Sequence, residues 1–159
     1  MLPHLRVQGG GRILQLSSEG GQIAYPGFSL YHATKWGIEG FVEAVAQEVA
    51  PFGIGLTLVE PGPTRTGFAQ GLVQAAATDA YRDTAVGDLR RAFADGAFRI
   101  TGDVEKMVPA IVAAATAEPA PRRLTLGSVA YGSIRAALQA RLAELEAGRG
   151  ITVAMDVAG

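Results

Sequence analysis

The chain has 159 residues, of which 48% are hydrophobic, so it can bury the core of one domain spanning residues 1–159. A formal net charge of −1 provides no long-range field for nucleic acid or an acidic membrane surface, so the expected partner is a small neutral ligand. The absence of cysteine excludes a disulfide framework and a thiolate nucleophile, and with only two histidines no metal site is expected.

The first residues, 1–11, form a short polar lead that ends in three glycines. They contain no apolar run of signal-peptide length, and no other part of the sequence is long and apolar enough to span a bilayer. We therefore expect a cytoplasmic protein with no membrane partner.

Two apolar strands and a helix between them follow this lead. Residues 12–18 predict a brief buried strand, which ends in a turn at residues 19–21. Residues 29–49 predict a helix with Ser29 as its N-cap, because apolar residues recur there at spacings of three and four. The expected packed face comprises Leu30, Ala33, Gly37, Phe41, Val45 and Val49. Residues 54–59 are apolar enough for a strand buried on both faces, so strand, helix and strand imply a parallel, right-handed unit.

The second half of the chain adds one more strand and further helices. Residues 61–101 combine proline and glycine with short helical pieces such as 79–94, and we expect this stretch to be mobile. Asp103 is the expected N-cap of a helix to about residue 115, and residues 124–126 predict a third strand. A last helix is expected over residues 129–147, with one face formed by Ile134, Leu138, Leu142 and Leu145. The elements together predict an α/β fold with three adjacent parallel strands.

Tyr31 and Lys35 lie four residues apart in the first predicted helix, so their side chains emerge from the same face. A free tyrosine, with a pKa of about 10, exchanges protons poorly at neutral pH. A nearby ammonium stabilises the phenolate and lowers that pKa. The pair could therefore move a proton to or from an alcohol or carbonyl oxygen.

Ser18 ends the first predicted strand, and Pro61 and Gly62 end the second. Ligands of open parallel sheets gather at the edge formed by the carboxyl ends of the strands. A serine hydroxyl at this edge could donate a hydrogen bond to the substrate oxygen and steady its developing negative charge. Three separated pieces of sequence therefore converge on one predicted crevice.

Three motifs in this order resemble consecutive signatures of the short-chain dehydrogenase/reductase family. They are GRILQLSS at residues 11–18, YHATK at 31–35 and PGPTRT at 61–66. The similarity extends from residue 1 to about residue 146, and residues 124–131 resemble the hydroxysteroid-dehydrogenase-like members. The resemblance implies the carboxyl-terminal part of a Rossmann-like, three-layer α/β fold, in which the family's amino-terminal strands are missing.

The resemblance also implies a role for each matching residue. Ser18 would bind the carbonyl oxygen, Tyr31 would be the acid/base residue, and Lys35 would hold the nicotinamide ribose and lower the tyrosine pKa. Six residues would contact the nicotinamide end of NAD(P), namely Tyr31, Lys35, Pro61, Gly62, Thr64 and Thr66. The implied reaction interconverts an alcohol and a carbonyl compound by hydride transfer, with a small alcohol or ketone as the substrate, usually in a homo-oligomer. The subgroup favours NADP slightly, but the residues that select NAD or NADP would precede Met1.

Two departures from the family pattern support a rival hypothesis. The chain contains no glycine-rich turn of the TGxxxGxG kind, whose backbone amides hold the pyrophosphate. It also contains no asparagine, whereas the family's catalytic asparagine lies upstream of the serine strand. The alternative function is that of a non-catalytic fragment or association module of such an enzyme.

Each motif also has a simpler structural interpretation when it is taken alone. Tyr31 could simply pack its ring in the fold while Lys35 reaches solvent. Ser18 could only cap the turn that follows it, and Pro61 and Gly62 could form only a turn. His32 and His4 are expected to be structural or solvent-facing. The arginine pairs at residues 90–91 and 122–123 are typical of a solvated surface.

Overall fold

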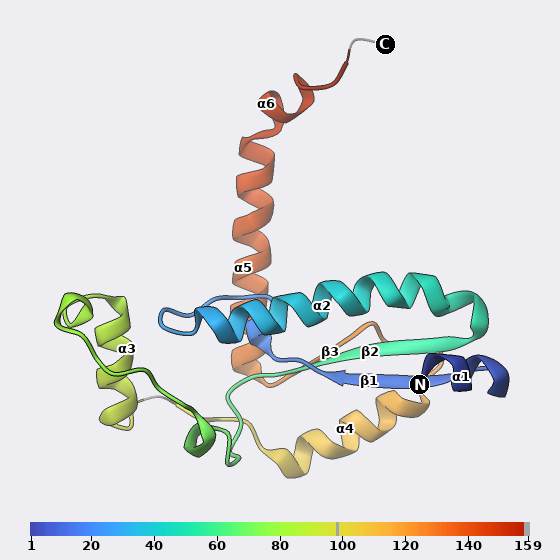
Figure 1. Ribbon diagram of the computed structural model, residues 1–159, viewed down its shortest axis with the longest axis horizontal. Coiled ribbons are helices and arrows are strands. Elements are labelled where there is room, and N and C mark those ends of the chain that lie inside the picture. The colour runs from blue at the N-terminus through green and yellow to red at the C-terminus, as the bar shows by residue number, and fades with distance from the viewer. Residues whose placement is uncertain (98, 158–159) are drawn as a thin grey trace.

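Three parallel strands form the centre of the computed structural model, which describes residues 1–97 and 99–157. The strands lie side by side in the order β1-β2-β3 (Figure 1). Both pairings are parallel, as predicted. Their bounds are Gly11–Leu16 for β1, Ile54–Pro61 for β2 and Arg123–Leu126 for β3.

Helices cover both faces of this sheet. α2 (Ser29–Val49) lies on one face and α4 (Val104–Thr116) on the other, which gives the three layers expected (Figure 1). The longest remaining helix, α5, projects away from the sheet together with α6. The bounds of the other helices are Leu2–Gln8 for α1, Ala85–Ala94 for α3, Ser128–Ala147 for α5 and Arg149–Val153 for α6. None of the described helices combines the length and apolar character that a bilayer span requires.

Short 3₁₀ turns connect several of these elements. They are η1 (Glu19–Gly21), η2 (Ala50–Phe52), η3 (Ala69–Gly71) and η4 (Asp79–Tyr81). The last two lie, with α3, in the stretch where the sequence predicts short helical pieces. The expected mobility of this stretch stays a prediction, and Phe98 within it lies outside the described residues.

The amino-terminal helix α1 was not expected from the sequence. It has only 7 residues, and only Leu2 and Leu5 pack against the core, so its periodic signal is weak. Gly9 ends it in the left-handed region, with φ of 89°, where glycine is favoured.

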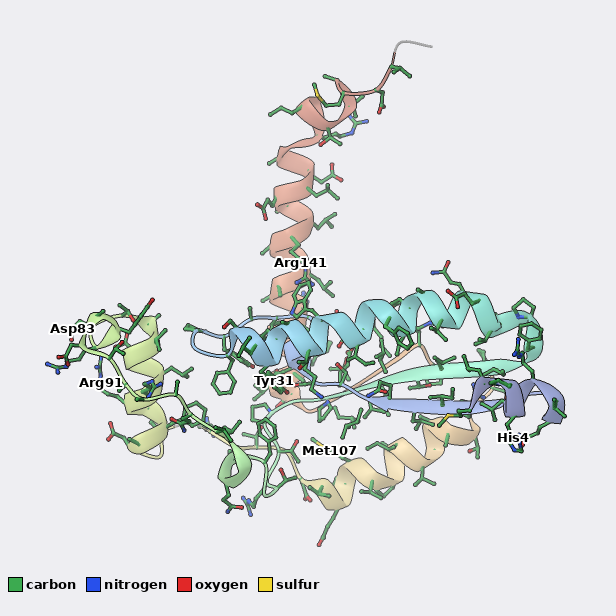
Figure 2. All side chains as sticks on the ribbon, viewed as in Figure 1. His4, Tyr31, Asp83, Arg91, Met107 and Arg141 are labelled. Atoms are coloured by element: carbon green, nitrogen blue, oxygen red, sulfur yellow. The ribbon has the colours of Figure 1, made fainter. Side chains whose placement is uncertain are left out.

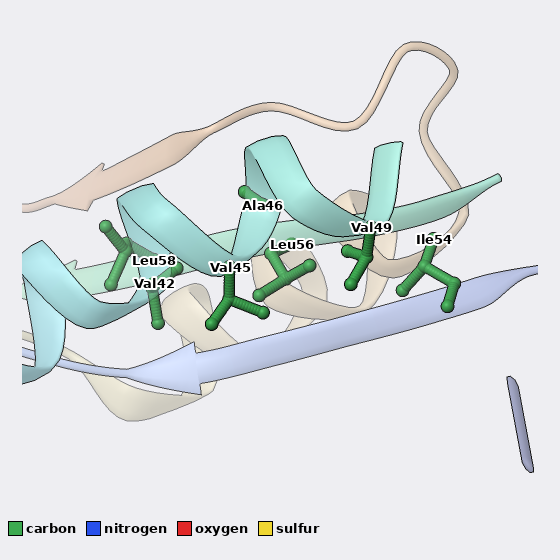
Figure 3. Packing of buried hydrophobic residues seen from close by; sticks show 7 residues of the cluster. All are labelled: Val42, Val45, Ala46, Val49, Ile54, Leu56 and Leu58. Carbon is green, nitrogen blue, oxygen red and sulfur yellow. The ribbon is translucent and has the colours of Figure 1, made fainter. Parts of the chain in front are cut away.

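The core lies between α2 and β2. Figure 3 shows side chains from the helix facing those of the strand, and the cluster comprises Val42, Val45, Ala46, Val49, Ile54, Leu56 and Leu58. Leu58 has an exposed fraction of 0%, in agreement with a strand covered on both faces. Burial of such side chains drives α2 onto the sheet, at roughly 25 cal/mol per Å² of apolar surface.

The buried face of α2 differs from the expected one. Val45 and Val49 are buried, as predicted, but Leu30 and Phe41 are 83% and 62% exposed. The polar residues His32 and Glu39 take part in the buried face instead, because partners outside the helix satisfy their hydrogen bonds. Apolar periodicity alone therefore predicts the helix correctly and its orientation only in part.

The two predicted helix caps have different outcomes. Asp103 caps α4, since its carboxylate accepts a hydrogen bond of 3.0 Å from the Glu105 amide. The prediction that Ser29 is the N-cap of α2 was wrong, because Ser29 is the first residue of the helix itself. Phe28 occupies the cap position, without a side-chain hydrogen bond.

The turn after β1 approaches α2 so closely that it leaves no room for a side chain at Gly21. A Cβ atom there would lie 1.9 Å from a Glu39 carboxylate oxygen and 2.9 Å from the Ser17 hydroxyl. The carboxylate is held by a 2.7 Å hydrogen bond from that hydroxyl and by an ion pair to Arg123, so it cannot easily move aside.

We predict that Gly21→Ala lowers the free energy of unfolding by about 1–3 kcal/mol, because the added methyl overpacks this contact. Gly37→Ala is the matched control, since nothing lies within 4 Å of its Cβ position and the residue is in the middle of α2. It should raise stability by about 0.5–1 kcal/mol. Urea denaturation followed by circular dichroism checks both values, and equal effects of the two substitutions would contradict the steric argument.

Candidate active site

The carboxyl ends of the three strands open on one edge of the sheet. Leu16 of β1 pairs with Val59, and Pro61 at the end of β2 pairs with Leu126. A cavity of about 390 Å³ lies at this edge. All residues predicted for the site line it, namely Ser18, Tyr31, Lys35, Pro61, Gly62, Thr64 and Thr66. Figure 2 shows Tyr31 on α2 and Met107 on α4, which approach the cavity from opposite faces of the sheet.

Ser18 follows β1 and faces the first turn of α2. Its hydroxyl oxygen accepts a hydrogen bond of 3.1 Å from the Gly20 amide, so it caps η1 as the structural interpretation proposed. The same hydroxyl lies beside the Tyr31 side chain and lowers the pKa of that tyrosine. Capping and participation in the site are therefore compatible, because a hydroxyl can accept one hydrogen bond and donate another.

Tyr31 lies half-buried among aromatic rings. The centroid of the Phe28 ring is 6.0 Å from that of Tyr31 and the Phe68 centroid is 5.8 Å away. Burial raises the pKa of Tyr31, the hydrogen bond with Ser18 lowers it, and the negative charge of Glu19 raises it. The net shift is upward, which is opposite to the lowering expected from the sequence.

Lys35 lies one turn further along α2 and joins the helix to the end of β1. Its ammonium donates hydrogen bonds of 3.3 Å each to the carbonyl oxygens of Leu16 and Ser17. It lies 5.8 Å from the centroid of the Tyr31 ring. Burial lowers the pKa of Lys35, and the negative charge of Glu39 opposes that shift. The ammonium is thus held within the site by main-chain oxygens.

The loop after β2 contributes the remaining predicted residues. The Gly62 amide donates to the Leu126 carbonyl at 3.0 Å, and the Thr64 hydroxyl donates to the Gly62 carbonyl at 2.7 Å. A Cβ atom at Gly62 would lie 3.1 Å from Ala130, so glycine suits this close contact with α5. The Thr66 hydroxyl accepts a hydrogen bond of 3.2 Å from the Phe68 amide. These bonds hold the loop over the cavity beside Tyr31.

Two residues missed in the sequence, Glu19 and Tyr25, also line the cavity. Glu19 is buried, and its carboxylate accepts hydrogen bonds from the Tyr25 hydroxyl and, at 2.8 Å, from the Ser133 hydroxyl. Burial, together with the hydrogen bond and charge of Glu19, raises the pKa of Tyr25. The position of Glu19 directly after Ser18 is the only sequence signal that could have indicated its place.

His32 is buried and joins α2 to the turn that follows β1. One ring nitrogen, Nδ1, lies 2.8 Å from the Gly20 carbonyl oxygen, and Nε2 accepts a hydrogen bond of 2.7 Å from the Tyr25 amide. The structural alternative for His32 is therefore confirmed and the solvent-facing one is wrong. A neutral ring with its proton on Nδ1 satisfies both contacts.

An ion network lies beneath the site. Arg123 of β3 pairs with Glu39 and Glu60, and also with Glu43 at 2.8 Å. The prediction of a solvated surface was wrong for Arg123, because two of these carboxylates are buried. Burial lowers the pKa of Arg123, but hydrogen bonds to Glu39 and Glu60 and their charges raise it above its ordinary value. The guanidinium therefore stays charged.

Comparison with known proteins finds similar sequences over much of the chain. A family model described as short chain dehydrogenase matches residues 1–77. Oxidoreductase BOA17 of Botryotinia fuckeliana is 41% identical over 113 residues, which are 71% of this chain and 39% of that protein.

Solved structures extend the similarity to almost the whole chain. A short-chain dehydrogenase from Streptomyces avermitilis is 35% identical with a TM-score of 0.83, over 98% of this chain and 56% of its own. A short chain dehydrogenase from Burkholderia cenocepacia, in complex with NADP, shares the fold at 19% identity and a TM-score of 0.53, over 91% of this chain and 50% of its own. The chain thus spans about half the length of these structures.

We predict that Arg123→Met lowers the free energy of unfolding by about 3 kcal/mol, because it leaves buried carboxylates without their cation. The matched control is Arg122→Met, because the neighbouring Arg122 is exposed and its carbonyl, not its side chain, bonds to β2. Urea denaturation should show a loss for the first variant and a change within about 0.5 kcal/mol for the second. Equal stability of both variants would contradict a structural role for the network.

Proposed function

This chain belongs to the short-chain dehydrogenase/reductase family, and on that premise we propose that it interconverts an alcohol and a carbonyl compound with NAD(P), with Tyr31 as the acid/base residue. The predicted family and the Rossmann-like α/β fold are both confirmed by the comparisons. The chain spans 39% of Oxidoreductase BOA17 and 56% of the Streptomyces avermitilis structure, so the activity of those longer proteins is carried to it only as a proposal.

The observation that carries this proposal is the meeting of five separated residues in one cavity. Ser18 comes from the turn after β1, Tyr31 and Lys35 come from α2, and Thr64 and Thr66 come from the loop after β2. Ser18 and Tyr31 both line the cavity, and each carries a hydroxyl that can donate to one substrate oxygen. This arrangement suits a reaction in which that oxygen gains or loses a proton.

The residues present fit the nicotinamide end of such a cofactor. The Lys35 ammonium and the Tyr31 side chain line the same cavity as Pro61 and Gly62. Lys35, Thr64 and Thr66 offer polar groups that would hold the ribose and the carboxamide. When bound there, the nicotinamide ring supplies or accepts the hydride at the reacting carbon.

The chain's own residues would handle the proton and the substrate oxygen. Tyr31 would donate its hydroxyl proton to the oxygen during carbonyl reduction and would accept it during alcohol oxidation. Ser18 would donate a hydrogen bond to the same oxygen, while its own oxygen accepts the hydrogen bond from the Gly20 amide. Lys35, held by the carbonyls of Leu16 and Ser17, would place a positive charge beside the phenol.

Several finer predictions belong to this proposal. Pro61 and Gly62 would border the nicotinamide, and NADP is slightly favoured over NAD by resemblance to the hydroxysteroid-dehydrogenase-like subgroup. A homo-oligomer and a cytoplasmic location also remain predictions. The rival hypothesis, a non-catalytic module, makes a different prediction in the binding experiment that follows.

Titration of the folded chain with NADH and NADPH tests the proposal. We expect saturable binding of at least one cofactor, and Lys35→Ala should weaken it by about tenfold or more, because a charge-assisted hydrogen bond is lost. Lys106→Ala is the matched control, since Lys106 is the only other lysine and its side chain is 86% exposed. A folded chain that binds neither cofactor would favour the non-catalytic alternative.

Turnover of a ketone under the same conditions tests the role of Tyr31. Tyr31→Phe should reduce turnover by about 10²–10⁴-fold with cofactor binding retained, because only the proton-transferring hydroxyl is removed. Tyr81→Phe, at an exposed tyrosine of η4, should leave turnover unchanged. Retained activity in Tyr31→Phe would exclude Tyr31 as the acid/base residue.

The upward shift of the Tyr31 pKa predicts how the two directions depend on pH. Carbonyl reduction needs the phenol, so its rate should stay high through neutral pH and fall only as pH passes the raised pKa. Alcohol oxidation needs the phenolate, so its rate should rise with pH over the same range. Ser18→Ala removes the hydrogen bond that lowers the pKa, and both curves should move to higher pH. A shift to lower pH in pH-rate profiles would contradict this coupling.

A further inference from the structure

Aromatic rings and other apolar side chains from outside the motifs form part of the cavity lining. They come from three separate segments, namely the loop before α2, the loop after β2 and α3, and they comprise Tyr25, Phe28, Phe68, Leu89 and Phe93. None of the sequence motifs includes these residues. We refer to this set of five as the ring wall.

The rings of the wall continue into the site itself. The centroids of Phe93 and Phe28 are 6.1 Å apart, those of Phe28 and Tyr31 are 6.0 Å apart, and those of Tyr31 and Phe68 are 5.8 Å apart. These spacings are typical of stabilising aromatic pairs. A continuous aromatic surface therefore leads from α3 to the hydroxyl that would transfer the proton.

The charged groups of the cavity already have partners. Among the described lining residues, the charged side chains are Glu19 and Lys35. The Glu19 carboxylate accepts hydrogen bonds from Tyr25 and Ser133, and the Lys35 ammonium donates to two main-chain carbonyls. The ring wall itself contributes no cation. A substrate carboxylate or phosphate beside it would therefore lose water without gaining an ion pair.

We propose that the substrate is an uncharged ketone or secondary alcohol that carries an aromatic ring or a similarly bulky apolar group, which packs against the ring wall. This inference rests on the proposed function, because it takes Tyr31 and Ser18 as the groups that meet the substrate oxygen. The cavity volume of about 390 Å³ lies in the range of small-molecule sites. Sugars fit the wall poorly, since the Tyr25 hydroxyl, its one side-chain polar group, already donates to Glu19 and the other four side chains offer no hydrogen bonds.

The test compares 4-phenyl-2-butanone, acetone and pyruvate, which share a methyl ketone and differ in the group attached to it. Binding of each ketone to the folded protein is measured by ligand-observed NMR, and turnover is measured with NADH and NADPH. We expect saturable binding of the phenyl ketone at lower concentration than either of the other two. Turnover, if present, should show the same order in kcat/KM.

Phe93→Ala is the informative variant, because Phe93 lies near the end of α3 and outside the groups assigned to proton transfer. It should lower the preference for the phenyl ketone over acetone by about fivefold to tenfold, the loss expected for one aromatic contact. Phe41→Ala is the matched control, since Phe41 is 62% exposed on α2 and does not line the cavity. The preference of Phe41→Ala for the phenyl ketone over acetone should equal that of the unaltered protein.

The outcomes separate this inference from the proposed function. Binding of the phenyl ketone that weakens in Phe93→Ala supports the ring wall even if no turnover occurs, and turnover failure then counts against the proposed reaction alone. Preference for pyruvate, or equal binding of the phenyl ketone by Phe93→Ala and the unaltered protein, would overturn the inference. Circular dichroism checks whether Phe93→Ala is folded. If Phe93→Ala is unfolded, the comparison uses Phe93→Leu, which keeps an apolar side chain but removes the ring.

Discussion

The close contact between the end of β1 and α2 is the constraint on which the site depends. Gly20 and Gly21 lie where a Cβ atom would meet Tyr31 and Glu39, so the turn can approach the helix without side chains between them. Side chains of α2 form hydrogen bonds across this contact, from Lys35 to the carbonyls of Leu16 and Ser17 and between His32 and the turn. Because of them, Ser18 reaches Tyr31 although the two residues come from different elements. The geometry of the proposed proton transfer is thus a property of backbone packing as much as of the reacting groups.

Charge beneath the site extends this arrangement to the third strand. Glu39 of α2 and Glu60 of β2 are buried, and Arg123 of β3 forms an ion pair with each of them. Buried carboxylates are costly unless they are paired and hydrogen-bonded, so the network ties the helix to two strands at a defined position. Glu39 also accepts a hydrogen bond from the Ser17 hydroxyl, and its negative charge opposes the lowering of the Lys35 pKa by burial. Support of the fold and electrostatic control of the site therefore converge on one side chain.

Much of the fold could be predicted because its signals are local in the chain. The apolar run of β2 and the periodicity of α2 indicated both elements, and the four-residue spacing of Tyr31 and Lys35 placed them on one helix face. The orientation of α2 was only partly predicted, since His32 and Glu39 are buried with partners from distant segments. For the same reason Arg123 gave no signal in the sequence, because its partners lie 63 and 84 residues away. The raised pKa of Tyr31 likewise depends on burial by rings that only the fold brings together.

The ring wall stands apart from the pieces that hold the sheet together. Phe68, Leu89 and Phe93 belong to the segment between β2 and α4, which contributes no strand to the described sheet, whereas Ser18, Tyr31 and Lys35 lie on or beside β1 and α2. Exchange of side chains in that segment can therefore alter which molecules enter the cavity and leave the groups proposed for proton transfer in place. Such a division allows substrate preference to diverge among related proteins over evolutionary time at little cost in stability.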